Sequence, residues 1–262
     1  MDKKPTFDIL GNIALVKFSK EAKQKDKKRF AESLLKKNPS IKTVLEKTGK
    51  FKGRLRKQET KYLLGEKSKE VLYRENGCDF RFNIDTTYFS PRLSNERKEI
   101  SKLIKKGDEV LVMFAGVAPF SIVIARHSMA RKVYSVEINR EATKYAKLNT
   151  ELNKVKGKVE IVQGDIKRIA KKFVNEKKKF NAIVMPRPQL KDNFLHEAFS
   201  LSKKGTKIYY YGFCGNNEKN KILDEIKDEA KKAKKRIKIL KTKVAGEVAP
   251  YRIRLRVDFR VL

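Results

Sequence analysis

The sequence predicts an α/β protein in which a small α+β module (residues 1–90) precedes a doubly wound parallel sheet (residues 91–262). Three observations support this fold class. After residue 106, apolar segments of strand length alternate with segments of helical periodicity. A turn of small residues, 115–118, follows the first apolar segment and opens a helix. The second apolar segment ends on an acid, Glu137, as in sheets that bind a nucleoside at the carboxyl ends of their strands.

The first module contains short elements of mixed type. Apolar segments on both sides of Gly11-Asn12 predict a strand pair, and the spacing of Phe30 and Leu34 is that of a helix. Gly65-Glu66 and Glu75-Asn76-Gly77 mark turns. The predicted elements are a strand pair over 8–18, a helix over 23–37, a strand over 41–46 and extended segments over 53–64 and 70–84.

The second region begins with a predicted helix, residues 95–105, and then alternates strand and helix. Its clearest helix covers residues 140–153. A lysine-rich helix over 218–235 precedes two segments that form an antiparallel pair at the end of the sheet. The predicted strands are 109–114, 132–137, 158–162, 182–185, 207–211, 237–244 and 252–261.

The charge of the chain points to a polyanionic partner. Among 262 residues, 65 are Lys or Arg and 31 are Asp or Glu, which gives a formal net charge of +34. Such an excess destabilises a compact protein through self-repulsion. Nucleic acid is the first candidate partner. An anionic membrane surface is the second, but no apolar run of about 18 residues is present to span a bilayer. Solvated lysine-rich helix faces would explain part of the charge without any ligand.

Cysteine and histidine usage implies neither a metal site nor a disulfide framework. Cys78 and Cys214 are far apart, and His127 and His196 lie outside any motif with ligand spacing. Reduced thiols and the absence of a signal peptide indicate a cytoplasmic protein. Because the sequence shows no exposed apolar stripe, we expect a monomer.

The turn at 115–118 favours S-adenosyl-L-methionine as cofactor. It contains one glycine, Gly116, and so differs from the dinucleotide pattern GxGxxG. S-adenosylmethionine has no pyrophosphate to cradle and fits this turn better. Glu137, about 20 residues on, is placed to accept hydrogen bonds from both ribose hydroxyls. An ordinary βαβ unit without a ligand is the alternative.

Two more loops follow predicted strands and should reach the same crevice. Asp165 comes after the third strand, where an acid accepts a hydrogen bond from the adenine amine or caps the next helix. Pro186-Arg187-Pro188 comes after the fourth strand, and its prolines hold the backbone carbonyls in fixed positions. A rigid turn without ligand contact is the alternative.

Basic residues beside aromatic ones favour RNA binding, since cations pair with phosphates and flat rings stack on splayed bases. A solvated charged face is the alternative. The basic residues are Arg54, Arg56 and Lys57 in the first module and Arg92 and Arg97 at the junction, and the aromatic ones are Phe51, Tyr88 and Phe89.

Glu96 is an acid among the cations Arg92, Arg97 and Lys98, which favour its ionised form. An ionised carboxylate beside a methyl donor is able to take a proton from a weakly acidic ring N–H. The alternative is a carboxylate at a helix start, paired with Arg97 or Lys98, and the residues alone favour it.

Several segments resemble the archaeal and eukaryotic tRNA (guanine-37-N1) methyltransferases. They are TVLEKTGKFKGRLR, YRENGCDFRFNIDTTYFSPRLSNER, MFAGVAPFSI, VYSVEINREA and KLNTELNK. The resemblance runs from about residue 8 to the end of the chain. It implies a small RNA-binding module before a Rossmann-type domain that binds S-adenosyl-L-methionine. It also implies methylation of N1 of guanosine 37, flipped out of the anticodon stem-loop of tRNA.

The resemblance assigns roles to single residues. Glu96 matches the proposed general base, Arg56 the arginine that contacts the target guanine, and Tyr88 an aromatic residue near the same base. The implied cofactor-binding positions are Phe114, Ala115, Gly116, Val117, Glu137, Asp165, Pro186 and Pro188.

Three features depart from the family pattern. Val112 stands where the family usually has Asp, and Pro186-Arg187-Pro188 stands where it has Asn-Leu-Pro or Asn-Pro-Pro. The N-terminal domain with which many relatives grip the tRNA elbow is expected to be missing. These departures keep two alternatives open. One is a wybutosine-pathway enzyme that transfers an aminocarboxypropyl group or methylates a tricyclic guanosine derivative. The other is an inactive tRNA-binding homologue.

Overall fold

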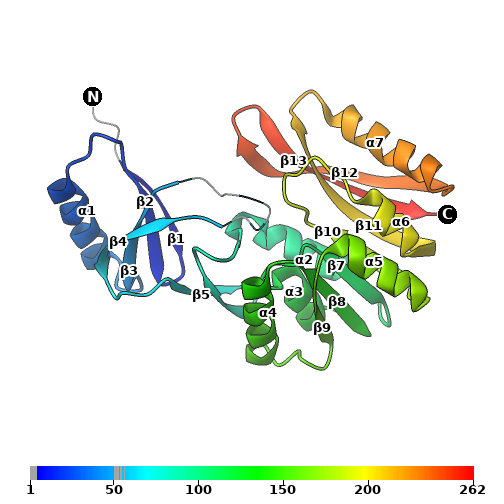
Figure 1. Ribbon diagram of the computed structural model, residues 1–262, viewed down its shortest axis with the longest axis horizontal. Coiled ribbons are helices and arrows are strands. Elements are labelled where there is room, and N and C mark those ends of the chain that lie inside the picture. The colour runs from blue at the N-terminus through cyan, green and yellow to red at the C-terminus, as the bar shows by residue number, and fades with distance from the viewer. Residues whose placement is uncertain (1–4, 50–52, 54, 56) are drawn as a thin grey trace. The chain divides into compact units, whose positions relative to one another are not determined.

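The computed structural model describes residues 5–49, 53, 55 and 57–262. The chain divides into two compact units, an N-terminal unit (Met1–Pro91) and a C-terminal unit (Arg92–Leu262) (Figure 1). The predicted assignment of the first unit to RNA binding stays a prediction. No helix among the described residues combines the length and the apolar character needed to cross a membrane.

The N-terminal unit contains a four-stranded sheet in the order β1-β2-β3-β4 and a separate hairpin, β5-β6. The predicted strand pair at Gly11-Asn12 is confirmed as an antiparallel β1-β2 hairpin. Gly11 has φ +55°, and a Cβ there would lie 1.7 Å from the backbone oxygen of Leu72. The turn therefore requires glycine. The elements are β1 Thr6–Leu10, β2 Ile13–Lys17, α1 Gln24–Lys37, β3 Thr43–Lys47, β4 Thr60–Gly65, β5 Glu70–Glu75 and β6 Cys78–Asn83.

Helix α1 connects two parallel strands, β2 and β3, and so completes a βαβ unit. Ala31 and Leu34 of α1 are buried against Ala14, Val16 and Val44 of the sheet. The extended segment predicted over 53–64 is a strand only from Thr60 onward among its described residues.

The C-terminal unit is built on a seven-stranded sheet in the order β12-β13-β11-β10-β7-β8-β9. Strands β7 to β11 pair in parallel, whereas β13 is antiparallel to both of its neighbours. The doubly wound sheet and the antiparallel end pair are therefore confirmed. The strands are β7 Glu109–Met113, β8 Lys132–Glu137, β9 Val159–Gln163, β10 Phe180–Met185, β11 Ser202–Gly215, β12 Ile237–Ala249 and β13 Arg252–Val261.

Helices cover both faces of this sheet (Figure 1). On one face, α2 packs on α3, and α3 and α4 pack on β8. On the other face, apolar residues of α5, α6 and α7 share one core with alternate residues of the strands, such as Ile183 and Tyr210. The helices are α2 Ser94–Leu103, α3 Pro119–His127, α4 Arg140–Leu152, α5 Ile166–Asn175, α6 Leu195–Ser200 and α7 Lys219–Lys232, with a short 3-10 helix at Pro91–Leu93.

Strand β11 is longer than the predicted strand over 207–211. Its residues 207–215 pair with residues 252–260 of β13 in a continuous antiparallel ladder. The sequence pattern did not predict this extension, because the partner strand supplies the hydrogen bonds that continue β11. The extension matters for the site, because it places Tyr211 directly opposite Arg256.

Candidate active site

The loops after four parallel strands lie along one edge of the sheet. The strands β10, β7, β8 and β9 are neighbours in this order. Val184 pairs with Val112, Met113 with Val136, and Glu137 with Gln163, so the strands end side by side. The chain runs outward from β7 to β9 and then returns to β10 on the other side of β7. Ligands of open α/β sheets bind where the strand order reverses, so we expect the ligand outside the carboxyl ends of β7 and β10.

The loop after β7 is held in an unusual backbone conformation. Phe114, Gly116 and Ala118 have φ values of 57°, 57° and 67°. Positive φ values are unfavourable for residues other than glycine. They occur where the surrounding structure fixes the backbone, often at functional sites.

Neighbouring elements fix this loop. The backbone N–H of Ala115 donates to the Val136 carbonyl at 2.9 Å. The side-chain amide of Asn149, on α4, donates to the Val117 carbonyl at 3.2 Å. The Phe114 ring meets Phe194 edge-on, with 4.8 Å between the ring centroids. Contacts within the protein therefore fix the conformation of this loop.

Glu137 connects the loops after β7 and β8. Its Oε2 accepts a hydrogen bond from the Gly116 N–H at 2.8 Å, and its Oε1 accepts one from the Asn139 N–H at 2.7 Å. Burial raises the pKa of Glu137, and these backbone hydrogen bonds offset part of the rise. A carboxylate has about four acceptor sites, so capacity remains for ligand hydroxyls. This arrangement fits the ribose of S-adenosylmethionine.

Asp165 caps helix α5. Its Oδ1 accepts a hydrogen bond from the Lys167 N–H at 3.0 Å, which confirms the predicted capping role. The preceding Gly164 donates its N–H to the Glu137 carbonyl oxygen at 2.8 Å. This bond ties the loops after β8 and β9 together. Contact of Asp165 with adenine stays a prediction.

The loop after β10 is anchored by Arg187, which lies between Pro186 and Pro188 and is only 7% exposed. Its Nη1 donates to the carbonyl oxygens of Leu190 and Asp192, both at 3.1 Å. The guanidinium carbon lies 5.3 Å from the centre of the Tyr210 ring. An arginine side chain therefore braces this loop in addition to the two prolines.

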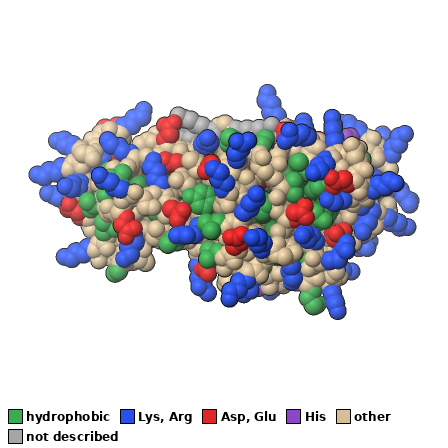
Figure 2. Space-filling model, turned by 60° about the horizontal axis from the view of Figure 1, so that its bottom comes forward, with side chains coloured by type: hydrophobic (Ala, Val, Ile, Leu, Met, Phe, Trp, Pro, Cys, Tyr) green, Lys and Arg blue, Asp and Glu red, His purple; other side chains and the backbone are tan. Residues whose placement is uncertain are grey.

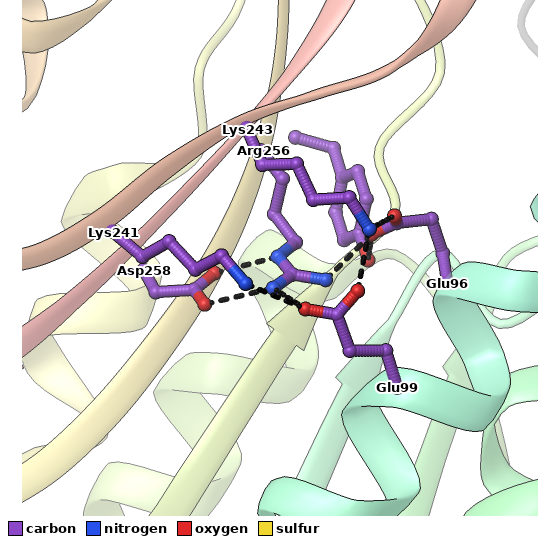
Figure 3. Close-up of polar contacts among 7 residues, drawn as sticks. Glu96, Glu99, Lys241, Lys243, Arg256 and Asp258 are labelled. Atoms are coloured by element: carbon purple, nitrogen blue, oxygen red, sulfur yellow. Dashed lines mark hydrogen bonds and ion pairs between the residues drawn. The ribbon is translucent and has the colours of Figure 1, made fainter.

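Glu96 lies at the start of α2 among charged residues from the C-terminal strands (Figure 3). Its Oε2 accepts hydrogen bonds from Arg256 Nη1 at 2.7 Å and from the Tyr211 hydroxyl at 3.0 Å. Its Oε1 accepts one from Lys243 Nζ at 2.8 Å. Tyr211 and Lys243 both pair with Arg256 in the sheet register, so the three partners form one row across β11, β13 and β12.

Glu99, one helical turn after Glu96, joins the same network. It accepts from Arg256 Nη2 at 2.6 Å and from Lys241 Nζ at 3.0 Å, and it also pairs with Lys243. We name this network the Glu96 cluster. Its members are Glu96, Glu99, Tyr211, Lys241, Lys243, Arg256 and Asp258, where Asp258 binds the Arg256 guanidinium through two oxygens.

The Glu96 cluster favours an ionised Glu96. Burial raises the pKa of this carboxyl, but the hydrogen bond from Lys243 and the charge of Arg256 outweigh it, so the pKa falls below its ordinary value. The predicted effect of nearby cations is thus present, with other cations than expected. The described partners of Glu96 come from the C-terminal strands rather than from Arg97 or Lys98.

The residues predicted to contact RNA have different environments. Arg54, Arg56 and Phe51 lie outside the described residues. Lys57 and Arg92 are exposed, and Tyr88 is half-buried at the end of the N-terminal unit. The structure contradicts the prediction that Arg97 contacts RNA. Its side chain is 1% exposed, and its guanidinium carbon lies 5.7 Å from the centre of the Phe120 ring. A guanidinium in this position is not available to a phosphate.

Sequence reasoning missed the partners of Glu96. Arg256 follows Glu96 by 160 residues, Lys243 by 147 and Tyr211 by 115. The alternation of β13 gave no sign of them, because Arg256 and Asp258 share the polar face of the strand with the exposed Arg252 and Arg260, and their burial is visible only in the structure. Buried charges of this kind require partners.

Among the described residues, no group of three or more His, Cys, Asp and Glu side chains is placed to hold a metal ion. The sheet order, the fixed loop after β7 and the Glu137 carboxylate define a class of protein: transferases that use S-adenosylmethionine on a Rossmann-type fold.

Comparison with known families agrees with this class. Residues 71–240 match the TRM5/TYW2 methyltransferase domain, and residues 2–68 match the TYW2 N-terminal domain. The chain belongs to the TRM5/TYW2 methyltransferase family.

Three similar proteins illustrate the relationship. The tRNA (guanine(37)-N(1))-methyltransferase Trm5b of Pyrococcus abyssi is 34% identical, over 98% of this chain and 74% of the relative. The tRNA (guanine(37)-N(1))/4-demethylwyosine(37)-methyltransferase Taw22 of Nanoarchaeum equitans is 31% identical, over 98% of this chain and all of the relative. The solved complex of aTrm5 and tRNALeu superposes with a TM-score of 0.84 at 29% identity, over 98% of this chain and 72% of that one.

Proposed function

We propose that this chain transfers the methyl group of S-adenosylmethionine to N1 of guanosine 37 in the anticodon stem-loop of tRNA. The observation that carries the proposal is family membership that extends over both units, together with relatives named for this activity at about 30% identity. We name the edge of the sheet formed by the loops after β7, β8, β9 and β10 the cofactor edge. The cofactor edge and the Glu96 cluster agree with this chemistry.

The loop after β7 and Glu137 would hold the cofactor. The small residues of the loop leave room for the nucleoside beside the backbone, and Glu137 would accept hydrogen bonds from the ribose hydroxyls. When bound, S-adenosylmethionine supplies an electrophilic methyl group on a positively charged sulfur. The loop that Arg187 braces would lie on the β10 side of the same crevice.

Glu96 would accept the proton from N1 of the guanine. The carboxylate is ionised at neutral pH, because its pKa lies below an ordinary value that is itself well under 7, and the ionised form is the one that accepts a proton. Arg56 would stabilise the negative charge that develops on O6 as the proton leaves, and Tyr88 would pack on the flipped base. The resemblance to the family supports these last two roles, and Arg56 lies outside the described residues.

Binding of tRNA would depend on the basic surface. The net charge is +34, and Figure 2 shows Lys and Arg side chains over most of the face in view. Lys57 and Arg92 are exposed and remain proposed RNA contacts. Counterion release from neutralised phosphates would supply much of the affinity.

Glu96→Gln is the test of the chemistry. Glutamine keeps the size of the side chain but cannot take the proton, so the single-turnover rate should fall by about 10²–10⁴-fold while the cofactor and tRNA still bind. The assay measures transfer from labelled cofactor to a tRNA transcript with G37, and a transcript with A37 tests the target position.

A matched control is Glu141→Gln. Glu141 also lies in the first turn of a helix, α4, and pairs with Lys144 at 2.7 Å. The Glu141→Gln variant should methylate tRNA at the wild-type rate. If Glu96→Gln melts at a lower temperature but keeps the wild-type rate, Glu96 is only a structural ion-pair partner.

A second candidate substrate is a tricyclic guanosine derivative at the same position. It is favoured by the match of residues 2–68 to the TYW2 N-terminal domain and by the full-length similarity to the Taw22 relative. Mass spectrometry of nucleosides from tRNA with G37 and from tRNA with the tricyclic base separates the two substrates. Addition of an aminocarboxypropyl group instead of a methyl group would indicate the other wybutosine-pathway reaction.

A further inference from the structure

We propose that Lys243 is a latch on Glu96: it occupies the carboxylate oxygen through which Glu96 would take the substrate proton, and it moves fully onto Glu99 when the substrate arrives. The inference rests on the proposed function, because that function makes Glu96 the proton acceptor. It adds a positioning residue, on strand β12, to the residues that act in the reaction.

The two oxygens of Glu96 have different surroundings (Figure 3). Oε2 accepts hydrogen bonds from Arg256 and Tyr211, whose side chains are fully buried. Oε1 accepts its hydrogen bond from Lys243, whose side chain is 35% exposed. A substrate that approaches from solvent would therefore meet Oε1, and at Oε1 it would meet the Lys243 ammonium.

Lys243 already has a second carboxylate partner. Its Nζ is bonded to Glu99 Oε2 as well as to Glu96 Oε1. Glu99 lies one helical turn further along α2, so a small rotation of the lysine side chain releases Oε1 and keeps the ammonium paired. Because the ammonium stays paired with Glu99, the movement leaves Lys243 without an uncompensated charge.

The charges around Glu96 favour such a movement. The charged groups that face it from the packed elements are Glu99 on α2, Lys241 and Lys243 on β12, and Arg256 and Asp258 on β13, while Tyr211 on β11 donates a neutral hydroxyl. With Glu96 included, three carboxylates balance three cations. Withdrawal of Lys243 from Oε1 makes the site more negative locally and raises the attraction of Glu96 for a proton.

The chemical step then balances. The N1–H bond of guanine breaks, and its proton forms an O–H bond at Oε1 of Glu96. The electron pair stays with N1, which bonds to the methyl carbon as the carbon–sulfur pair returns to sulfur. The proton on Glu96 leaves to solvent afterwards, and Lys243 returns to Oε1.

The experiment compares Lys243→Met with a matched control, Lys238→Met. Lys238 lies on the same strand, is exposed and is not a member of the Glu96 cluster. Single-turnover rates on the G37 transcript are measured from pH 5 to pH 8. The carboxyl resonance of Glu96, assigned with Glu96→Gln, is titrated by ¹³C NMR in the same proteins without substrate.

For Lys243→Met we expect a higher NMR midpoint for Glu96. We also expect the acid limb of the rate–pH profile to lie at a higher pH than in the wild type, because Glu96 of the free variant takes up a proton more readily. The rate at pH 8 should be equal to or above that of the wild type. Lys238→Met should follow the wild type in both measurements, and Lys243→Arg, which keeps the charge, should restore the wild-type profile.

Two results would overturn the latch alone. One is an active Lys243→Met protein whose pH profile and NMR midpoint match those of Lys238→Met. The other is a rate at pH 8 that falls tenfold or more in a protein that still binds the cofactor normally, since Lys243 would then hold Glu96 in place. A wild-type protein that transfers no methyl group to either tRNA would overturn the proposed function and the latch together.

Discussion

Replacement of Arg256 by methionine should destabilise the C-terminal unit strongly. The Arg256 side chain is fully buried and binds Glu96, Glu99 and Asp258. Removal of one partner from a buried ion pair costs about 3–5 kcal/mol, because the remaining charge stays buried without compensation. Lys243 still reaches Glu96 and Glu99, so we expect the lower end, about 3 kcal/mol at pH 7. For a unit of this size, the melting temperature should fall by about 6–12 °C.

The penalty should shrink as the pH falls. In the wild type, the pKa values of Glu96 and Glu99 are lowered, so their contribution to stability is complete above the unfolded pKa of about 4.3 and is lost as the pH falls through the folded values. In Arg256→Met the same carboxyls lack the guanidinium and take up protons more readily. Protonation removes the uncompensated buried charges, so the loss of stability in the variant becomes smaller as the pH falls. The difference in unfolding free energy should therefore be largest at pH 7 and smaller at pH 4.5.

Urea and thermal unfolding, followed by circular dichroism at both pH values, provide the assay. Arg260→Met is the matched control, because Arg260 lies on the same strand but is exposed. Surface substitutions of this kind usually change stability by about 0.5 kcal/mol or less. If the unfolding free energies of Arg256→Met and Arg260→Met at pH 7 differ by less than about 1 kcal/mol, the stability of the Glu96 cluster does not depend on the Arg256 guanidinium.

Other outcomes are expected for the cofactor edge and the RNA surface. Glu137→Ala should weaken S-adenosylmethionine binding by about 10- to 150-fold in calorimetric titration, from the loss of about 1.5–3 kcal/mol, and an unchanged dissociation constant would remove Glu137 from the site. Binding of tRNA should weaken by about 10³-fold or more between 50 and 200 mM salt if six phosphates are neutralised, whereas a flat response would mean that the lysines are only a solvated surface. Arg187→Leu should leave the carbonyls of Leu190 and Asp192 without their donor, and urea unfolding should show a loss of about 1–3 kcal/mol in stability. An unchanged stability would show that the prolines alone make the loop rigid.

The cofactor edge could be predicted from the sequence, because each of its loops is defined by residues that are close together in the chain. Each loop directly follows its own strand, and parallel strands bring their carboxyl ends to the same edge. Gly116 and Glu137 could therefore be placed together before the structure was known, and their hydrogen bond agrees with that placement.

The surroundings of Glu96 could not be predicted in the same way. Its partners depend on how β11, β13 and β12 pair, and a shift of one residue in this register would turn Arg256 to the opposite face of the sheet. The burial of Arg97 was also hidden, because the sequence does not show that α2 packs on α3 and brings the guanidinium over Phe120.

The position of β13 has a consequence for the order in which the protein matures. This strand follows every other strand in the sequence, yet it lies between β11 and β12 in the sheet. During synthesis from the N-terminus, β7 to β11 are able to pair while β13 is still to be made, whereas β12 waits for β13 as its neighbour. Glu96 gains its buried arginine only at that final insertion. A growing chain that lacks β13 should thus already be able to form the cofactor edge but not a neutralised Glu96, so competence for methyl transfer would arise only once β13 has been made and has paired.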